Sequence, residues 1–553
     1  MRPLVGRRRA RDSGSVNDPD AVRALHWSTL LGERPAHPER LVPFRRLDPA
    51  NRPAPFKRYP GLSATPLPRG LARSTLAATE VLSGRRAEAT SLTGERLATL
   101  LFLTAGVTRY TVTDDGERVF FRTAMSAGNL HPIEVYVVTD ASVGHYEPLE
   151  HALTALRGAP EPAEGAATLV LTGIPFRTCW KYGERGWRHL WWDAGTMVAN
   201  LLSAADGLGV PARVVTGFPD AQVAELVGVD GLDEAPLVLV SLGHAGPADG
   251  GLPDPAGIGP LQGRAAPVAP RPLRLPMVLA AHEATSLDAA SVTPWLAAVR
   301  SVAAPAPEAV DPPPWPDAGL LPAGPSPAGP SPAGGSTPGP GPADRVEEVI
   351  RRRGSSRLFD PSAVPETLLL WGLGAATRAV PGDLTSDRTL LEHLVNVHGL
   401  EGVSPGPYRY TPAGGYESVP GPADPRGAAT RLCLDQPLGG DAAFTTFQAA
   451  KLDRLLETGG ARAYRAAHLE AGIVAGRLSL NASALGFGAT GLTFYDTLVA
   501  RYFDTVALPL LATAVGRPGT SPAPSGLPGQ PAALTRYGNV AARLWARLQR
   551  DGR

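Results

Sequence analysis

A proline- and glycine-rich segment divides this 553-residue chain into two long parts. Residues 301–343 include the string P-A-G-P-S-P-A-G-P-S-P-A-G-G-S, which offers almost no side chain able to pack in a core. Such a composition predicts a semi-extended, disordered linker. Because the chain is also longer than one hydrophobic core usually organises, we expect separate folded domains on the two sides of this linker.

The same order of features occurs on both sides of the linker. The acid of D-A-G at residues 193–195 is followed fifteen positions later by Leu208, and the acid of E-A-G at residues 470–472 is followed fifteen positions later by Leu485. Two divergent copies of one fold explain this order most simply. The repeat therefore predicts an α+β protein whose two copies form an intramolecular pseudo-dimer.

Hydrophobic periodicity predicts the elements of both copies. A long apolar helix at residues 193–208 should end at Gly209, a residue suited to the left-handed position after a helix. We interpret G-H-Y-E-P at residues 144–148 as a turn, which Y-R-Y-T-P at residues 408–412 echoes. The expected parts are an extended N-terminal arm at 1–70 with a helix near 21–31, a first domain at 71–300 and a second domain at 344–553. Further helices are expected at 94–105, 221–227, 345–353 and 368–376, and strands at 118–122, 133–138, 167–172, 210–215, 236–242 and 510–515.

The charge and cysteine content exclude several classes of protein. The formal net charge is +1, whereas a nucleic-acid binder needs a basic face that collects phosphates. No run approaches the roughly 18–20 apolar residues of a membrane helix, and the arginine run at residues 7–11 lacks the apolar stretch of a secretory signal. Cys179 and Cys433 are too few for a disulfide framework or a zinc site. We therefore expect a cytoplasmic protein with no metal site.

Residues 180–195, W-K-Y-G-E-R-G-W-R-H-L-W-W-D-A-G, place a lysine, a tyrosine and four tryptophans at the start of an apolar helix. Lysine is rare here: Lys57, Lys181 and Lys451 are the only three among 53 basic residues. Unlike a guanidinium, an amine can lose its charge on burial, which suits it to proton transfer. The residues alone leave two interpretations open, a cofactor site or a surface lysine beside a packing cluster.

Two further sets of residues suit a flat, phosphorylated ligand. The string R-R-G-S-S-R at residues 352–357 and the G-R-P ending at 516–518 bring arginines that can grip a phosphate. The strings S-A-G-N at 126–129 and G-A-T-G at 488–491 predict small-residue loops whose backbone can approach a ligand closely. Each set has an ordinary alternative, namely scattered charges at an exposed helix end and an asparagine that only forms a turn.

Taken together, these motifs resemble the nitroreductase-like flavoprotein superfamily, and within it the SagB-type dehydrogenases of thiazole/oxazole-modified peptide biosynthesis. The resemblance covers most of residues 55–245 and 344–520, with several motifs in order. In the first copy it is carried by M-S-A-G-N-L-H-P-I-E-V-Y-V-V at 125–138, G-H-Y-E-P-L-E-H-A-L at 144–153, K-Y-G-E-R-G-W-R-H-L-W-W-D-A-G at 181–195 and E-A-P-L-V-L-V at 234–240. In the second copy it is carried by R-x-S-x-R at 353–357, G-A-T-G at 488–491 and G-R-P at 516–518.

The resemblance implies FMN bound between two tandem nitroreductase-like domains, each an antiparallel or mixed sheet flanked by helices. It implies Lys181 and Tyr182 as proton-handling residues in the oxidation of a peptide thiazoline or oxazoline to the azole. A base of near-neutral pKa would take the ring proton while the flavin takes the hydride, and desolvation by Trp180 and Trp187 would lower that pKa. The implied partners are a modified precursor peptide and a cyclodehydratase complex. The implied cofactor-binding residues are Ser126, Ala127, Gly128, Asn129, Arg353, Ser355, Arg357, Gly488, Thr490, Gly491 and Arg517.

The two copies depart from the family pattern in complementary ways. In the first copy, R-R-A-E-A at residues 85–89 lacks the serine and the further arginine of the phosphate clamp. In the second copy, residues 377–384 and 462–465 stand in the places of the S-A-G-N loop and of the Lys-Tyr pair. We therefore expect one composite FMN site, in which the second copy holds the phosphate and the first supplies Lys181.

Two other functions remain compatible with the residues. One is an NAD(P)H-dependent nitro- or ene-reductase on the same fold, in which NADPH would bleach the flavin without any peptide. The other is a flavin-free partner that scaffolds a cyclodehydratase or holds a precursor peptide, and such a protein would be colourless. The N-terminal 70 residues either contact such partners or lie over the core as a fixed arm.

Overall fold

The computed structural model describes residues 19–32, 47–114, 116–158, 164–243, 252–311, 341, 343–384, 387–411 and 415–534. Most of the linker expected at 301–343 lies outside these residues, and so does the arginine run at 7–11. Within the described residues, no helix is long and apolar enough to cross a membrane.

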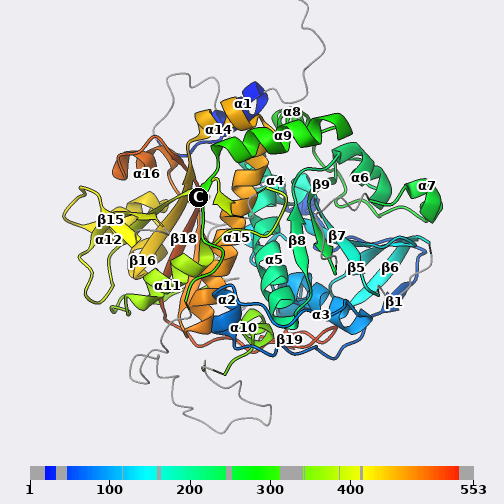
Figure 1. The fold of residues 1–553 in the computed structure, drawn as a ribbon, viewed down its shortest axis with the longest axis horizontal. Coiled ribbons are helices and arrows are strands. Elements are labelled where there is room, and N and C mark those ends of the chain that lie inside the picture. Colours follow the sequence, from blue (N-terminus) through cyan, green and yellow to red (C-terminus); the bar gives the residue numbers. More distant parts are fainter. Residues whose placement is uncertain are drawn as a thin grey trace, which may run out of the picture.

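Two seven-stranded sheets lie on opposite sides of a central pair of long helices (Figure 1). The first sheet has the order β1-β6-β5-β4-β7-β9-β8, and the second has the order β11-β18-β16-β13-β14-β15, with β17 also paired to β18. Every pair of neighbouring strands in both sheets is antiparallel. The first sheet consists of β1 (Ala64–Pro66), β4 (Ile133–Val138), β5 (Val143–Glu147), β6 (Ala152–Arg157), β7 (Ala167–Gly173), β8 (Ala212–Val215) and β9 (Ala235–Leu242). The second consists of β11 (Phe359–Asp360), β13 (Glu392–Val397), β14 (Gly406–Thr411), β15 (Gly415–Ser418), β16 (Phe444–Ala450), β17 (Gly488–Leu492) and β18 (Leu508–Pro518).

The two central helices are α5 (Gly186–Leu208) and α15 (Arg462–Ala484), which lie side by side in the middle of Figure 1. They approach most closely at the glycines of the repeated D-A-G and E-A-G strings. A Cβ on Gly195 would lie 2.7 Å from Gly472 Cα, and a Cβ on Gly472 would lie 3.0 Å from Gly195 Cα. The D-A-G and E-A-G strings noted in the sequence therefore mark a contact between α5 and α15, because only glycine permits this approach.

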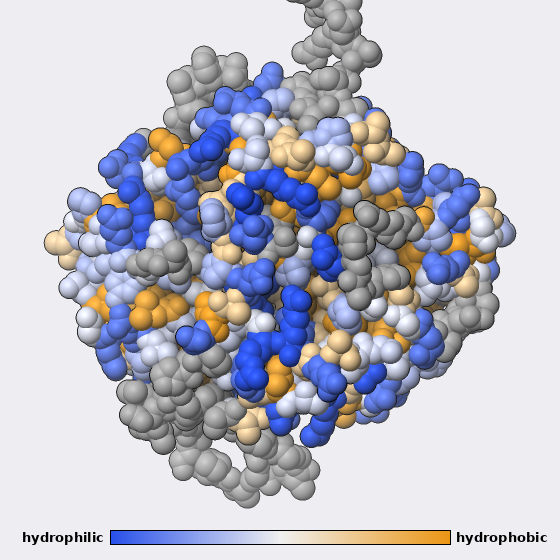
Figure 2. All heavy atoms as spheres, in the orientation of Figure 1, coloured by the Kyte–Doolittle hydropathy of each residue, from blue (hydrophilic) through white to orange (hydrophobic). Residues whose placement is uncertain are grey.

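Shorter helices surround the two sheets. Helix α1 is part of the core, because Val22, Leu25 and His26 are fully buried, and it packs against α8. On the face shown in Figure 2, strongly hydrophilic side chains gather over the middle of the molecule, and apolar side chains form small scattered groups. The helices are α1 (Pro19–Ser28), α2 (Ala78–Leu82), α3 (Gly94–Ala105), α4 (Pro175–Tyr182), α6 (Asp220–Val227), α7 (Pro255–Ile258), α8 (Pro276–Ala284), α9 (Ala289–Val302), α10 (Val346–Arg352), α11 (Thr367–Ala376), α12 (Pro425–Leu432), α13 (Pro437–Asp441), α14 (Leu452–Gly459) and α16 (Asp496–Tyr502), with 3-10 turns η2 (Pro49–Asn51), η3 (Ala127–Asn129) and η4 (Gly183–Arg185).

Short strands also join distant parts of the chain. Near the C-terminal end of the described chain, β19 (Ala532–Ala533) pairs in parallel with β2 (Val107–Val112), which pairs with β3 (Arg118–Arg122). The second half thus returns to complete a sheet of the first. Just before the linker, β10 (Ala304–Pro305) pairs with β12 (Arg388–Thr389) of the second half.

Buried ion pairs cross between the halves in both directions. Near the start of α5, Arg185 and Arg188 bind Asp496, the first residue of α16, at 2.9 and 3.0 Å. At the start of α15, Arg462 and Arg465 bind Asp220, the first residue of α6, at 2.5 and 2.7 Å in the same manner. Because each carboxylate also lies in the first turn of a helix, where negative charge is favourable, it is doubly compensated.

Several predicted elements are confirmed, and two short strings, G-H-Y-E-P and G-A-T-G, were misinterpreted. The strands at 118–122 and 133–138 and the helix at 94–105 have the expected bounds, and Gly209 has the expected left-handed backbone with φ 70°. The G-H-Y-E-P string, predicted as a turn, forms strand β5, because its polar side chains find buried partners on the sheet.

The G-A-T-G string, predicted as a loop, is also a strand. It forms β17 and pairs with β18 along its whole length. Its first glycine is needed for close packing, since a Cβ on Gly488 would lie 2.1 Å from Ser356 Oγ. The long helix predicted at 193–208 begins seven residues earlier, at Gly186, because Trp187 and Trp191 are fully buried against the core.

Candidate functional site

The loop before β4 lies directly against the end of α4. A Cβ on Gly128 would lie 2.7 Å from Tyr182 Oη and 3.2 Å from Lys181 Nζ. Gly128, Asn129 and His131 all have left-handed backbones, with φ of 64°, 58° and 47°. Such conformations are unfavourable for residues other than glycine and are held only where the surroundings determine them. The structure therefore brings the predicted loop and the predicted Lys-Tyr pair into contact.

The side chains of this loop are bound to the protein itself. Ser126 Oγ donates to Asp193 Oδ2 at 2.6 Å, and the Ala127 N–H donates to Asp193 Oδ1 at 3.0 Å. Asn129 donates from Nδ2 to the Phe120 carbonyl at 2.9 Å, and its Oδ1 lies 2.9 Å from His131 Nε2. Ser126 and Asn129 were predicted as cofactor-binding residues, and their side chains shape the loop, so its backbone faces the Lys-Tyr pair.

The electrostatic surroundings of the Lys-Tyr pair favour proton transfer. Burial, and to a smaller extent the nearby positive charge of Arg357, lower the pKa of Lys181 to about 8. Burial raises the pKa of Tyr182 above its ordinary value, and the negative charge of Asp193 adds to this effect. Near neutral pH the amine is therefore partly uncharged, whereas the phenol keeps its proton.

The second half contributes arginines to the same place. Arg353 is buried and donates from Nη2 to the carbonyl of Thr123, three residues before the loop, at 2.8 Å. Its Nε and Nη1 have no hydrogen-bond partner among the residues that the structure describes. Burial and the charge of Arg109 lower its pKa to about 9. A buried guanidinium in this state fits an anionic ligand, since such charges are normally paired.

The remaining predicted residues of the second half lie beside Arg353. Ser355 forms a parallel bridge to Ala489 of β17, and Gly488 pairs with Gly516, the neighbour of Arg517 on β18. The Arg517 guanidinium lies 5.7 Å from the centre of the Phe487 ring. Thr490 and Gly491 continue β17, Thr490 buried and Gly491 exposed. The pairing of β17 with β18 thus brings Ser355, Gly488 and Arg517 to neighbouring positions.

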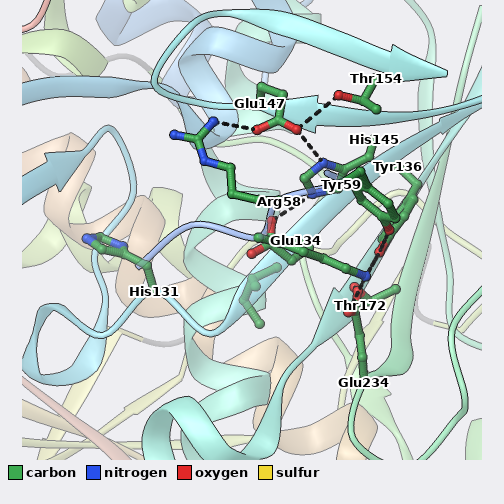
Figure 3. A network of polar contacts seen from close by, with 12 residues as sticks. Arg58, Tyr59, His131, Glu134, Tyr136, His145, Glu147, Thr154, Thr172 and Glu234 are labelled. Atoms are coloured by element: carbon green, nitrogen blue, oxygen red, sulfur yellow. Dashed lines mark hydrogen bonds and ion pairs between the residues drawn. The ribbon is translucent and has the colours of Figure 1, made fainter. Parts of the chain in front are cut away.

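A buried polar network behind α4 holds this helix in place (Figure 3). Arg177 lies one turn before Lys181 and forms a buried ion pair with Glu134 of β4. The same guanidinium donates to the carbonyls of His131, at the end of the loop, and Ala54, in the N-terminal arm, both at 3.0 Å. One side chain thus connects the helix, the loop and the arm.

The network continues across the outer face of the first sheet, where Figure 3 shows its members converging. His145 of β5 bridges Glu134 and Glu147 at 2.9 and 3.4 Å. From the arm, Lys57 donates to Glu234 and to Tyr136, both at 2.6 Å. Glu134, His145 and Glu234 all fall within the family strings quoted from the sequence, but their role depends on partners far apart in the chain.

The second half contains a counterpart of the Asp193 arrangement. Glu470 of α15 accepts from the Thr389 hydroxyl and, at 3.0 Å, from the Leu390 N–H. The counterpart of the S-A-G-N loop is therefore residues 389–391, and the prediction of 377–384 was wrong. The displacement arises because the acid on the central helix, rather than the preceding sequence, fixes the loop.

The predicted counterpart of the Lys-Tyr pair was also misplaced. Helix α14 precedes α15 as α4 precedes α5, and it ends at Thr458 and Gly459. The arginines at 462–465 instead match Arg185 and Arg188 in their ion pairs. The second half thus has no proton-transfer residue at the end of α14.

In the first half, residues 308–310 cover the residues that correspond to Arg353 and Gly354. Ser83 and Gly84 follow α2 as Arg353 and Gly354 follow α10. The Val310 N–H donates to the Ser83 carbonyl at 2.9 Å, and a Cβ on Gly84 would lie 2.9 Å from the Glu308 carbonyl oxygen. The following arginines have carboxylate partners, Arg85 with Glu80 and Arg86 with Asp206. This second place is therefore filled and neutralised.

No group of three or more metal-binding side chains occurs among the described residues. The two cysteines are buried and form no disulfide, Cys179 in α4 and Cys433 just after α12. The chemistry available at the site therefore comes from the amine, the phenol and the arginines.

Comparison with known proteins places the chain in a family. The model of the nitroreductase family matches residues 82–244. The chain is 30% identical to the microcin B17-processing protein McbC of Escherichia coli over 142 residues, 21% of this chain and about half (52%) of the length of McbC. It is also 30% identical to the nitroreductase-like protein MJ1384 of Methanocaldococcus jannaschii over 177 residues, 28% of this chain and 81% of that protein.

A solved structure extends the likeness to nearly the whole fold. A nitroreductase-like protein from Anabaena variabilis superposes with a TM-score of 0.64 at 22% identity, over 90% of this chain and 99% of that protein. At this identity the match concerns the fold, which includes both sheets and both central helices. The chain belongs to the nitroreductase family, whose members are generally flavin-dependent oxidoreductases.

Proposed function

We propose that this protein is an FMN-dependent dehydrogenase that oxidises thiazoline or oxazoline rings of a ribosomally made, post-translationally modified peptide to azoles. The observation that carries the proposal is the Lys181 amine, whose pKa burial lowers to about 8 and which lies against the Gly128 backbone. The similarity to McbC, a protein that processes the peptide microcin B17, supports a peptide substrate. The proposed partners are the modified precursor peptide and a cyclodehydratase complex.

The cofactor proposed for this site is one FMN, held by both halves. Arg353, Ser355, Arg357 and Arg517 would hold its phosphate, since the unmatched nitrogens of Arg353 call for an anion. The backbone of the loop at 126–129 and the β17 residues Gly488, Thr490 and Gly491 would line its ring. Bound FMN supplies the redox chemistry by accepting the hydride that leaves the azoline ring.

The chain's own residues would handle the proton. The uncharged Lys181 amine takes the proton from the ring carbon next to the one that loses hydride. The Tyr182 phenol, whose pKa burial raises, remains a hydrogen-bond donor and orients the substrate. Because the loop carries glycine at position 128, no side chain separates these two groups from the reacting ring.

We also propose that the chain is a pseudo-dimer of two tandem nitroreductase-like domains, at 71–300 and 344–553. The crossed ion pairs and the facing glycines support this arrangement. The covered second place predicts one FMN per chain. Flavin released by denaturation and quantified against protein tests this prediction, and two FMN per chain would contradict it.

The decisive test compares Lys181→Ala with Lys451→Ala. Lys451 is exposed and bound to Glu392 at 2.7 Å, far from the loop, so it is a matched control. With an azoline-containing peptide, mass spectrometry should show the loss of two hydrogens per ring for the control and a decrease of about 10²–10⁴-fold for Lys181→Ala. FMN content should be equal in both, and retained activity in Lys181→Ala would reject the assigned role.

The same preparations distinguish the alternatives. A colourless protein that takes up no FMN would indicate the flavin-free partner. Rapid bleaching of the flavin by NADPH without peptide would indicate a nitro- or ene-reductase. Flavin that stays oxidised with NADPH but is reduced by the azoline peptide agrees with the dehydrogenase.

A further inference from the structure

One buried carboxyl closes the loop that faces the Lys-Tyr pair. Asp193 accepts from Ser126 Oγ at 2.6 Å and from the Ala127 N–H at 3.0 Å. Ser126 Oγ in turn accepts from the His131 N–H at 2.8 Å, so both ends of the loop are tied to one side chain. On the same helix, Thr196 donates to the Met125 carbonyl at 2.9 Å. These contacts compensate for the unfavourable left-handed residues between them.

The position of this loop decides what surrounds the reacting groups. Gly128 lies so close that a Cβ there would be 2.7 Å from Tyr182 Oη and 3.2 Å from Lys181 Nζ. Packing at this distance shields part of the half-buried Lys181 from water, and desolvation is the main cause of its lowered pKa. A shift of the loop away from α4 would therefore expose Lys181 without changing Lys181 itself.

The second half contains a similar pair of hydrogen bonds between a helix acid and a loop, with which the Asp193 contacts can be compared. Glu470 ties the Thr389 hydroxyl and the Leu390 N–H to α15 in the same way. Burial raises the pKa of both acids, Asp193 and Glu470, to about 7. The helix before α15 ends in Thr458 and Gly459, so the second loop has no lysine or tyrosine to arrange.

We propose that Asp193 is a positioning residue of the site: through Ser126 and Ala127 it fixes Gly128 against Lys181 and Tyr182, whereas Glu470 has a purely structural role. The inference rests on the proposed function for its catalytic consequence. Its geometric core, that Asp193 controls the environment of the Lys181 amine, is independent of the substrate.

The charged and titratable groups around Asp193 are few. Tyr182 approaches from α4, and Asp193 raises its pKa. Lys181 and Arg357 lie beyond Tyr182, since both the lysine and the tyrosine respond to the arginine charge. His189, on the same helix, is buried, and burial together with nearby arginines keeps its pKa well below the ordinary value. Changes in the Lys181 titration can therefore be traced to the loop.

The scarcity of lysine permits a direct measurement. Reductive ¹³C-methylation of the purified, flavin-loaded protein labels at most Lys57, Lys181, Lys451 and the N-terminus, and Lys181→Arg identifies the signal of interest. In Asp193→Asn, we expect the Lys181 pKa to rise by about one unit, because the loop no longer desolvates the amine. In Glu470→Gln, the matched variant in the second half, we expect no shift. Equal shifts in both variants, or none in either, would overturn the proposal.

Turnover provides the second readout. Asp193→Asn should lower kcat by roughly 10²-fold with little change in the KM for an azoline peptide, and its pH profile should move upward with the Lys181 pKa. Glu470→Gln should leave kcat and the pH profile unchanged. If Asp193→Asn does not fold, Ser126→Ala, which keeps the bond from Ala127, should show the same shifts in smaller form, and wild-type values in Ser126→Ala would contradict the proposal.

The two readouts separate the two proposals. If wild type has no azoline dehydrogenase activity but the Lys181 signal still responds to Asp193→Asn alone, the proposed function fails and the positioning role stands. If azole formation occurs and Asp193→Asn behaves like Glu470→Gln, the positioning role fails and the proposed function stands.

Discussion

The helix pairs α4–α5 and α14–α15 share one plan and differ in one respect. Both long helices begin with two arginines that bind a carboxylate of the other half, and both carry an acid that ties down a loop. Helix α4 ends in Lys181 and Tyr182, however, whereas α14 ends in Thr458 and Gly459. The two helix pairs are therefore alike in these contacts, and the Lys-Tyr pair is present in only one half.

The physical reason lies in what each residue depends on. Buried arginines and carboxylates must keep their partners, because an unpaired buried charge is strongly unfavourable. A lysine at a helix end can be lost without harm to folding. The segment at 303–310 packs on Ser83 and Gly84, so the chain itself occupies the place in the first half that corresponds to Arg353 and Gly354. The contacts between the halves are therefore alike on the two sides, and the Lys-Tyr pair is not.

The largest expected effect comes from breaking the crossed ion pairs. Asp496→Ala leaves Arg185 and Arg188 buried without a carboxylate, and Asp220→Ala does the same to the arginines at the start of α15. Each variant should lose about 3–5 kcal/mol of unfolding free energy, measured by urea denaturation. Only Asp496→Ala should also impair turnover at low temperature, because Arg185 follows Lys181 by four residues. Equal losses of activity would show that the halves share the chemistry.

A smaller effect should distinguish Arg353, which has no carboxylate partner among the described residues, from Arg352, which has one. Arg353→Met removes a buried guanidinium that lacks a carboxylate among the described residues, so the flavin-free protein should not be destabilised. FMN affinity, measured by fluorescence titration, should fall by about 1.5–3 kcal/mol. Arg352→Met is the matched control: Arg352 is bound to Asp344 at 2.8 Å, so its loss should lower stability and spare FMN binding.

The pH dependence of stability should be the same in both halves. Burial raises the pKa of Asp193 and of Glu470 from ordinary acid values to about 7. Each acid therefore contributes stability that is present below pH 4 and is lost as the pH rises through 7. Relative to wild type, Asp193→Asn and Glu470→Gln should each gain about 1.4 kcal/mol per pH unit between pH 5 and 7. Urea denaturation at several pH values measures this, and a pH-independent difference would contradict it.

The smallest expected effect concerns two glycines. Gly128 has φ 64° and faces Tyr182, so Gly128→Ala should lower stability by roughly 1–2 kcal/mol and reduce turnover. Gly491 has only the Ala512 carbonyl oxygen, at 3.9 Å, near its would-be Cβ, so Gly491→Ala should change stability by less than about 0.5 kcal/mol. Thermal unfolding of both variants and steady-state kinetics of Gly128→Ala check this, and equal changes in stability would show that the loop has room.

The sequence was sufficient for the features that are local. Regular hydrophobic periodicity located α3, β3 and β4, and the composition of the Pro/Gly segment placed the two sheets on its two sides. Errors occurred where a polar or glycine-rich string lay inside a sheet, as in β5 and β17. There, buried partners such as Glu134 for His145, eleven residues earlier in the chain, satisfy side chains that otherwise indicate a turn.

By itself, the sequence determined the family and the unusual lysine, and it indicated the similar order of features on the two sides of the linker, because periodicity, composition and motif order are properties of short segments. Only the tertiary structure decided which residues face Lys181 and which loop is hydrogen-bonded to Asp193 or to Glu470. Those relations depend on hydrogen bonds and charges between α4, α5, the end of α10 and the chain around the loop at 126–129, residues up to 230 positions apart that share no local pattern. Burial then sets the pKa of the amine, and burial exists only once the chain is folded.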